Sequence, residues 1–180
     1  MRRARTRALF LAGAIALAFA PAGCSVGAGP VAMGGPDPSQ VCLGATRGHQ
    51  MLWGDFIQVP EGADVTISGA DLVDAEGIEV KDAWLAPPLD GALGASEFPP
   101  VRSPSWDARV AAAGAEAEEG YNNLVLLIER TGPDEGTAAA MRVAYSADGW
   151  DYTVHGSMSV VMRDDCIGEV SGEGTGNEDS

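Results

Sequence analysis

The sequence has 180 residues and a formal net charge of −15. Arg2, Arg3, Arg5 and Arg7 lie at the start, so the rest of the chain carries seven basic against 26 acidic side chains, a net charge of −19. This length suits one domain with a hydrophobic core, and this charge excludes nucleic acid as a partner because like charges repel. The remaining interpretations are a solvated acidic surface, cationic partners or divalent ions.

Residues 1–23 have the pattern of a signal peptide. The four arginines form a basic segment, and residues 8–20 are a run of 13 apolar residues. A run of that length is typical of a signal sequence and is too short to span a bilayer as a mature helix. No later stretch is long and apolar enough to span a bilayer, so we expect export followed by removal of this segment.

The motif Ala22-Gly23-Cys24 follows the apolar run and resembles the lipobox of bacterial lipoproteins. Pro21 departs from the aliphatic residue that this family prefers, so ordinary cleavage after Ala20 or Ala22 stays open. The resemblance implies a lipidated Cys24 and a protein anchored on the extracytoplasmic face of the cell membrane. More than one acyl chain would hold it stably, because a single chain binds only marginally.

Three further segments complete the predicted organisation. Residues 24–40 are rich in Gly and Pro and have no periodicity, which predicts a flexible tether that holds the domain about 20–25 Å from the membrane. Residues 41–166 form the folded domain. Residues 167–180 are Gly-rich and acidic, which predicts a disordered tail.

Alternating apolar and polar residues between turn signals predict antiparallel β structure in the first half of the domain. Residues 56–59 are the surest strand of the opening segment, and residues 64–73 and 78–85 both alternate. The residues expected to point inward are Val65, Ile67, Ile78, Val80 and Trp84, with Asp82 on the face of the last three.

The segment 123–130 is predicted to be the central strand. It holds five apolar residues in a row, with Gly120 before it and a turn cluster at 132–136 after it. Leu124, Leu126 and Ile128 share one face, and Val125 and Leu127 share the other. A strand that is apolar on both faces is covered on both.

The dipeptide Asp148-Gly149 predicts a two-residue type I′ hairpin turn. In that register, Tyr145 faces Tyr152, Val143 faces Val154 and Met141 faces Gly156, all on the inner side. Arg142 faces His155 on the outer side. The second strand is expected to continue through Met158, Val160 and Met162 and to end at Cys166.

Residues 86–120 are predicted to be a long crossover rather than regular structure. Five prolines make strand or helix unfavourable before Trp106, and residues 108–119 could form a short helix that Gly114 weakens. Connections of this length are often functional or mobile. We favour the simpler interpretation, a crossover that runs over the sandwich and is anchored by Phe98 and Trp106.

Cys42 and Cys166 bracket nearly all the predicted strands. Because export favours oxidation, we expect a disulfide between them, with two reduced thiols as the alternative. Lipid on Cys24 would leave these two as an even pair, in agreement with cysteine parity in exported proteins.

The predicted fold is therefore all-β, a single antiparallel sandwich of about seven to eight strands. Its early and late cysteines resemble those of immunoglobulin-like domains, although Trp84 lies 42 and Cys166 lies 124 residues after Cys42. The stretches 65–74 and 123–126, a tryptophan-bearing strand and a final hairpin that ends in cysteine are similar to exported lipoproteins of Gram-positive bacteria whose role is uncharacterised. That resemblance implies location and fold, with no activity.

No catalytic constellation is found, so the prediction is a protein that is not an enzyme and has no cofactor. Ser96 lacks the glycine pattern of a nucleophile elbow, and the acidic turn at 74–77 lacks the spacing of a calcium loop. The alternative function is extracytoplasmic copper binding through His49 and Met51, because imidazole beside a thioether suits copper(I). The leading hypothesis is a membrane-anchored lipoprotein that acts as a binding or envelope-associated module.

Overall fold

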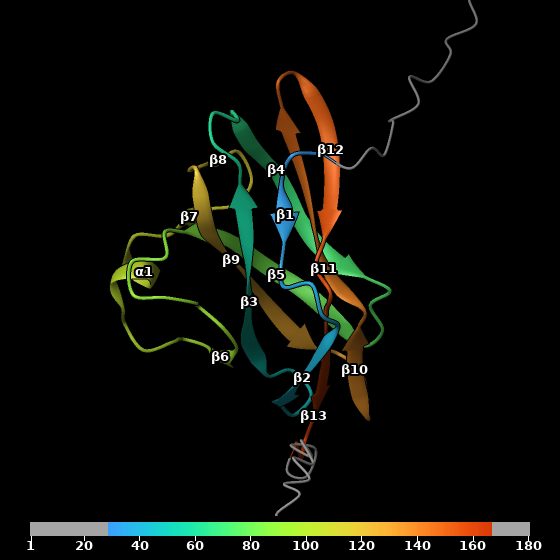
Figure 1. The fold of residues 1–180 in the computed structure, drawn as a ribbon. Helices are drawn as coiled ribbons and strands as arrows, with labels where there is room; N and C mark the ends of the chain where they lie inside the picture. The colour runs from blue at the N-terminus through green and yellow to red at the C-terminus, as the bar shows by residue number, and fades with distance from the viewer. Residues whose placement is uncertain (1–28, 167–180) are drawn as a thin grey trace, which may run out of the picture.

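The computed structural model describes residues 29–166, whose regular structure is β strand apart from one short helix (Figure 1). The signal segment 1–23, Cys24 and the tail 167–180 lie outside the described residues. The elements are β1 (Ala32–Met33), β2 (Ser39–Gly44), β3 (Gln50–Val59), β4 (Val65–Val73), β5 (Ile78–Ala86), β6 (Ser96–Glu97), α1 (Pro104–Asp107), β7 (Val110–Ala111), β8 (Glu116–Ala117), β9 (Gly120–Arg130), β10 (Glu135–Ala138), β11 (Ala140–Ala147), β12 (Trp150–His155) and β13 (Met158–Arg163). Within residues 29–166, no helix has the length and apolar character needed to cross a membrane.

Three sheets enclose one main hydrophobic core. The first has the order β1-β3-β9-β5-β7, with β6 added to β3, and the second has the order β12-β11-β4-β8. A third sheet, β10-β13-β2, closes the end of the sandwich that lies at the bottom of Figure 1. Eight of the described strands have six or more residues, so the prediction of an all-β sandwich is confirmed.

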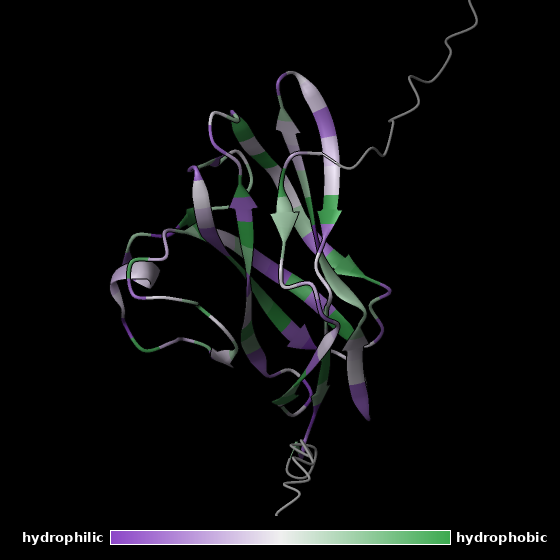
Figure 2. Cartoon of the chain, viewed as in Figure 1, coloured by the Kyte–Doolittle hydropathy of each residue, from purple (hydrophilic) through white to green (hydrophobic). Residues whose placement is uncertain are grey.

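The strand β9 is the centre of the first sheet, as predicted. It pairs with β3 on one side and β5 on the other, both antiparallel. Leu124, Leu126 and Ile128 are buried in the main core, whereas Val125 and Leu127 belong to a second apolar cluster on the opposite face. Figure 2 shows the hydrophobic stretch of this strand ending in a hydrophilic arrowhead.

The hairpin β11–β12 has the predicted register. Tyr145 pairs with Tyr152, and Arg142 pairs with His155. Asp148 and Gly149 both have positive φ angles, 52° and 79°, which is the backbone that a type I′ turn requires. The inner side chains of β11 are fully buried, so turn chemistry and alternation identified the same face.

The chain after this hairpin departs from the prediction. One continuous strand was expected up to Cys166, but β12 ends at His155, and β13 pairs instead with β10 and β2. Val160 and Met162 remain buried in the core as expected. The pairing with β2 is parallel, so the domain is not wholly antiparallel.

The flexible tether predicted over residues 24–40 is wrong in its second half. β1 pairs with β3, β2 lies in the third sheet, and Val31 and Met33 are buried in the core. The Val31 N–H also donates to the Tyr145 hydroxyl at 3.2 Å. Val31 and the edge strand β1 that follows it are thus held against the domain despite the surrounding Gly and Pro.

A bulge in β5 corrects the predicted orientation of Trp84. The pairing with β9 shifts between Val80 and Asp82, so that side chains after the shift exchange faces. Ala83 and Leu85 therefore contact the main core, and Trp84 joins the cluster on the outer face.

The predicted disulfide joins Cys42 to Cys166. The disulfide ties β2 to the segment just after β13, and β2 and β13 are neighbouring strands of one sheet. In immunoglobulin domains the disulfide instead joins the two layers of the sandwich. Arg130 lies at the same end of the domain and is only 2% exposed. Its guanidinium donates to the carbonyls of Ala45 and Pro133 and to Asp164, at 2.6, 3.2 and 2.7 Å.

Candidate functional site

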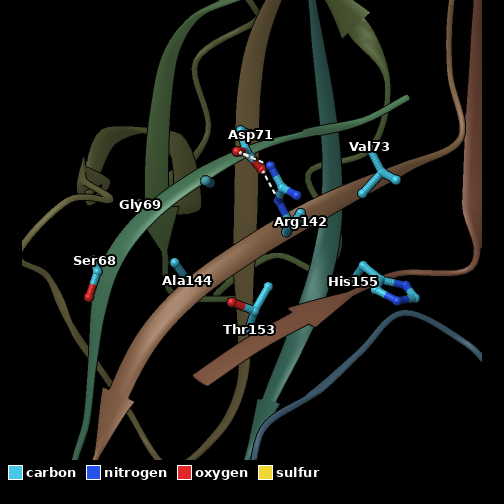
Figure 3. Close-up of a pocket in the computed structure, with 9 residues that line it drawn as sticks. Ser68, Gly69, Asp71, Val73, Arg142, Ala144, Thr153 and His155 are labelled. Carbon is cyan, nitrogen blue, oxygen red and sulfur yellow. Dashed lines mark hydrogen bonds and ion pairs between the residues drawn. The ribbon is translucent and has the colours of Figure 1, made fainter. Parts of the chain in front are cut away.

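The described residues form several hollows, and two of them are considered as binding sites. The first is an open hollow of about 690 Å³ on the outer face of β4, β11 and β12 (Figure 3). Gly69, Ala70 and Ala144 give it a lining of small residues, and Thr153 and His155 border it on β12.

An ion pair lies within this first hollow. Arg142 donates from Nε and a terminal nitrogen to the two carboxylate oxygens of Asp71, at 2.7 and 2.6 Å. Hydrogen bonding to Asp71, and the nearby charges of Asp71 and Asp74, raise the pKa of Arg142 above its usual value. Figure 3 shows the arginine turned towards Asp71, with the exposed His155 across the hollow. Because Asp71 already neutralises Arg142, the hollow offers no strong site for an anion.

The residues proposed for copper are not brought together. His49 is exposed and precedes β3, whereas Met51 is buried in the main core. A thioether enclosed by apolar side chains cannot bind the same copper ion as an imidazole at the surface, so the structure does not support this pair. Over residues 29–166 there is also no group of three or more His, Cys, Asp or Glu side chains placed to hold a metal ion.

The second surface is formed by the crossover of residues 86–120, which covers the outer face of β3 and β9. Its apolar contacts are the cluster Leu52, Trp106, Val125, Leu127, Trp84 and Leu93. Trp84 meets Trp106 edge to face at 5.2 Å and stacks with Phe98 at 6.4 Å. The predicted anchors Phe98 and Trp106 therefore both contact the sheet through Trp84, and Trp106 is buried.

Hydrogen bonds fix the crossover to the sheet. The buried Asn123 accepts from the Leu93 N–H at 2.9 Å and donates to the Gly91 carbonyl at 3.1 Å. Gly54 of β3 lies directly beneath Leu93 of the crossover. A Cβ added at Gly54 would be 1.6 Å from the Leu93 carbonyl oxygen. Only glycine allows this close approach of two backbones.

The short helix α1 replaces the helix considered for residues 108–119. It begins at Pro104, a position where the missing N–H costs nothing, and the Ser103 side chain caps it by accepting from the Trp106 N–H. Asp90 accepts hydrogen bonds from the Ser105 hydroxyl and N–H. The Ser105 hydroxyl lowers the pKa of Asp90, so this carboxylate at the surface is held in its ionised form.

The Arg109 side chain packs on the rings of Trp84 and Trp106. Its guanidinium carbon lies 3.8 Å from the centre of the Trp106 ring and 5.6 Å from that of Trp84. It also donates to the Trp106 carbonyl at 2.7 Å. Stacking on both rings stabilises the crossover through cation–π attraction.

A hollow of about 260 Å³ remains between the crossover and the sheet. Leu52, Val125 and Trp106 supply its apolar lining, and Asp90 and Val101 lie at its border. Val101 is 91% exposed, Leu89, which precedes Asp90 in the chain, is 65% exposed, and Phe98 is 37% exposed. We call this hollow and these three exposed side chains the crossover face.

Asp55 is a polar group that the sequence analysis missed. It lies on β3 between Trp53 and Ile57, both buried in the core, with Gly34 and Gly156 close to its Oδ2. Burial raises the pKa of Asp55, an effect that the hydrogen bond from the Phe56 N–H partly offsets. Its alternation with core residues was the signal that could have found it.

No protein-family model and no curated protein matches the chain. Among solved structures, the ASH/PapD-like domain 7 of human CEP192 covers 88% of this chain and 98% of that domain, at 10% identity and a TM-score of 0.37. The Vibrio cholerae VesB protease covers 74% of this chain at 7% identity and a TM-score of 0.35, and the chain spans 32% of that protease. TM-scores below 0.5 are too low to support a shared fold or function, so the fold assignment is based on the strands and their pairing.

Proposed function

We propose that the protein is a lipid-anchored extracytoplasmic β-sandwich that serves as a non-enzymatic binding or envelope-associated module. The observation that carries the proposal is the pairing of Cys42 with Cys166. Of the three cysteines this leaves Cys24, which directly follows Ala22-Gly23 at the end of the apolar run. An odd cysteine in an exported protein is a thiol still to be accounted for, and the lipobox-like Ala22-Gly23-Cys24 makes a lipid its proposed partner.

Chain geometry would hold the sandwich close to the bilayer. Gly29 is already in contact with the domain, since a Cβ there would meet the Tyr145 hydroxyl and the Tyr152 ring. Five Cα steps separate Gly29 from Cys24 and cover at most ~18 Å. The sandwich would thus be displayed nearer the membrane than the 16-residue tether predicted.

The acidic surface agrees with a display role. With a net charge of −19 after the first seven residues, the domain is repelled by anionic headgroups and stays in solution beside the membrane. The role would then be to present a face to another macromolecule.

Metabolic labelling with a fatty-acid analogue tests the anchor. Wild type should incorporate the label and fractionate with membranes, and Cys24→Ala should lose both properties. Ser25→Ala is the matched control and should behave as wild type. Equal labelling of Cys24→Ala and wild type would overturn the proposal.

A further inference from the structure

We propose that the crossover face is the docking surface for a cationic polypeptide segment that carries one aliphatic or aromatic anchor side chain. This inference deepens the proposed function, since it names the surface and the chemistry of the partner that such a module would bind.

The crossover face is held in place before any partner binds. Asn123 bonds to the backbone of Gly91 and Leu93, and Asp90 bonds to Ser105. Trp106 fills the space against the sheet beneath Arg109. A surface fixed by such contacts loses little conformational entropy on binding, which favours affinity.

The exposed apolar side chains of this surface do not serve the core. Six large hydrophobic side chains are exposed in residues 29–166, and four of them, Leu89, Phe98, Val101 and Val110, lie on the crossover. Phe98, Trp84 and Trp106 form a continuous contact that leads to the hollow bordered by Val101. Of the four, Val101 lines this hollow and Val110 lines a different one. Exposed apolar groups beside a hollow are typical of protein-binding surfaces.

The charge of the crossover selects the partner. Residues 86–120 contain six acidic side chains and two arginines. Arg102 is paired with Asp107 at 3.3 Å, and Arg109 is stacked on tryptophan, so neither balances the ionised Asp90 at the border of the hollow. Asp90 is the acidic side chain that lines the hollow, and a carboxylate beside an apolar hollow is complementary to Lys or Arg beside an apolar anchor.

The size of the hollow limits the anchor to one side chain. Liquid water occupies about 30 Å³ per molecule, so a hollow of about 260 Å³ has the volume of a single large side chain. It is smaller than the usual pocket for a drug-sized molecule, roughly 300 Å³ or more. A second copy of this chain is disfavoured because both copies carry the same strong negative charge.

Panning a phage library of random dodecapeptides against the processed protein tests the inference. The selected peptides should carry Lys or Arg on either side of an aliphatic or aromatic residue. A synthetic peptide of that sequence should bind at least tenfold more weakly to Leu89→Asp and Val101→Asp, whose side chains are exposed. Trp150→Asp, an equally exposed apolar residue on β12, is the matched control and should bind as wild type.

Three outcomes would overturn the inference: no selected peptide, peptides without a cationic excess, or binding that Val101→Asp leaves unchanged. Sedimentation that shows self-association lost in Val101→Asp would identify a second copy as the occupant and would also overturn it. Peptide binding is measured without a membrane, so a negative result here is distinguishable from failure of the lipid label on Cys24.

Discussion

Replacing Arg130 with methionine should destabilise the domain by about 3 kcal/mol. The stem would still fill its buried space, but the Ala45 carbonyl would lose a hydrogen bond from a charged donor, worth roughly 1.5–3 kcal/mol. The Pro133 carbonyl and the exposed Asp164 can be solvated instead, so each adds under about 1 kcal/mol. For a domain of this size, the melting temperature should fall by roughly 10 °C.

Thermal unfolding followed by circular dichroism measures this effect, with two variants as controls. Arg142→Met removes an arginine with a bidentate but exposed ion pair and should cost less than about 1 kcal/mol. Asp164→Ala should also have little effect, because the backbone carbonyls are the important partners. A melting temperature for Arg130→Met within 1 °C of wild type, or an equal loss in Asp164→Ala, would refute this reasoning.

Three further predictions concern the crossover, the disulfide and the half-buried carboxylate of Asp55. Gly54→Ala should lift the crossover and speed its cleavage in limited proteolysis, whereas Gly69→Ala, where a Cβ meets nothing within 4 Å, should not; equal cleavage rates would contradict the close approach. Replacing Cys42 and Cys166 together with serine should lower the free energy of unfolding in urea by up to about 4–5 kcal/mol, because the bridge closes a long loop; an unchanged midpoint would contradict this estimate. Asp55→Asn should stabilise the protein at neutral pH, and its advantage over wild type should shrink as pH falls through the raised pKa of Asp55 and vanish below its unfolded value of 3.8; an advantage that persists in acid would contradict the assignment.

The sign of the Asp55 effect follows from proton binding. Burial raises the pKa of the folded state, so between the unfolded and folded values the native protein binds more protons than the unfolded chain. Stability therefore falls as pH rises through that interval, and the full cost of the ionised carboxylate is present above it.

The sequence predicted the parts of the fold that local chemistry determines. The two faces of β9 follow from alternation, and the register of β11 with β12 follows from the Asp148-Gly149 turn. A single unbroken pattern with its own turn needs no distant partner to be interpreted correctly.

The remaining features depend on contacts between distant segments. The bulge that turns Trp84 outward is set by pairing with β9, and the parallel β2–β13 pair joins segments about 120 residues apart. The edge strand β1 was concealed by its Gly and Pro neighbours. The sequence predicted a crossover anchored by Phe98 and Trp106 but no hollow beneath it, because the position of the crossover depends on Asn123 and Gly54, which lie on the strands it covers.

Mass spectrometry of the protein extracted from membranes would show both the lipid on Cys24 and the disulfide in one measurement. We expect a mature chain that begins at Cys24, with diacylglycerol on that residue, together with one peptide pair linked through Cys42 and Cys166. A mature chain that begins at Pro21 or Gly23 and carries an unmodified Cys24 would contradict the account, as would Cys42 and Cys166 both free to alkylate.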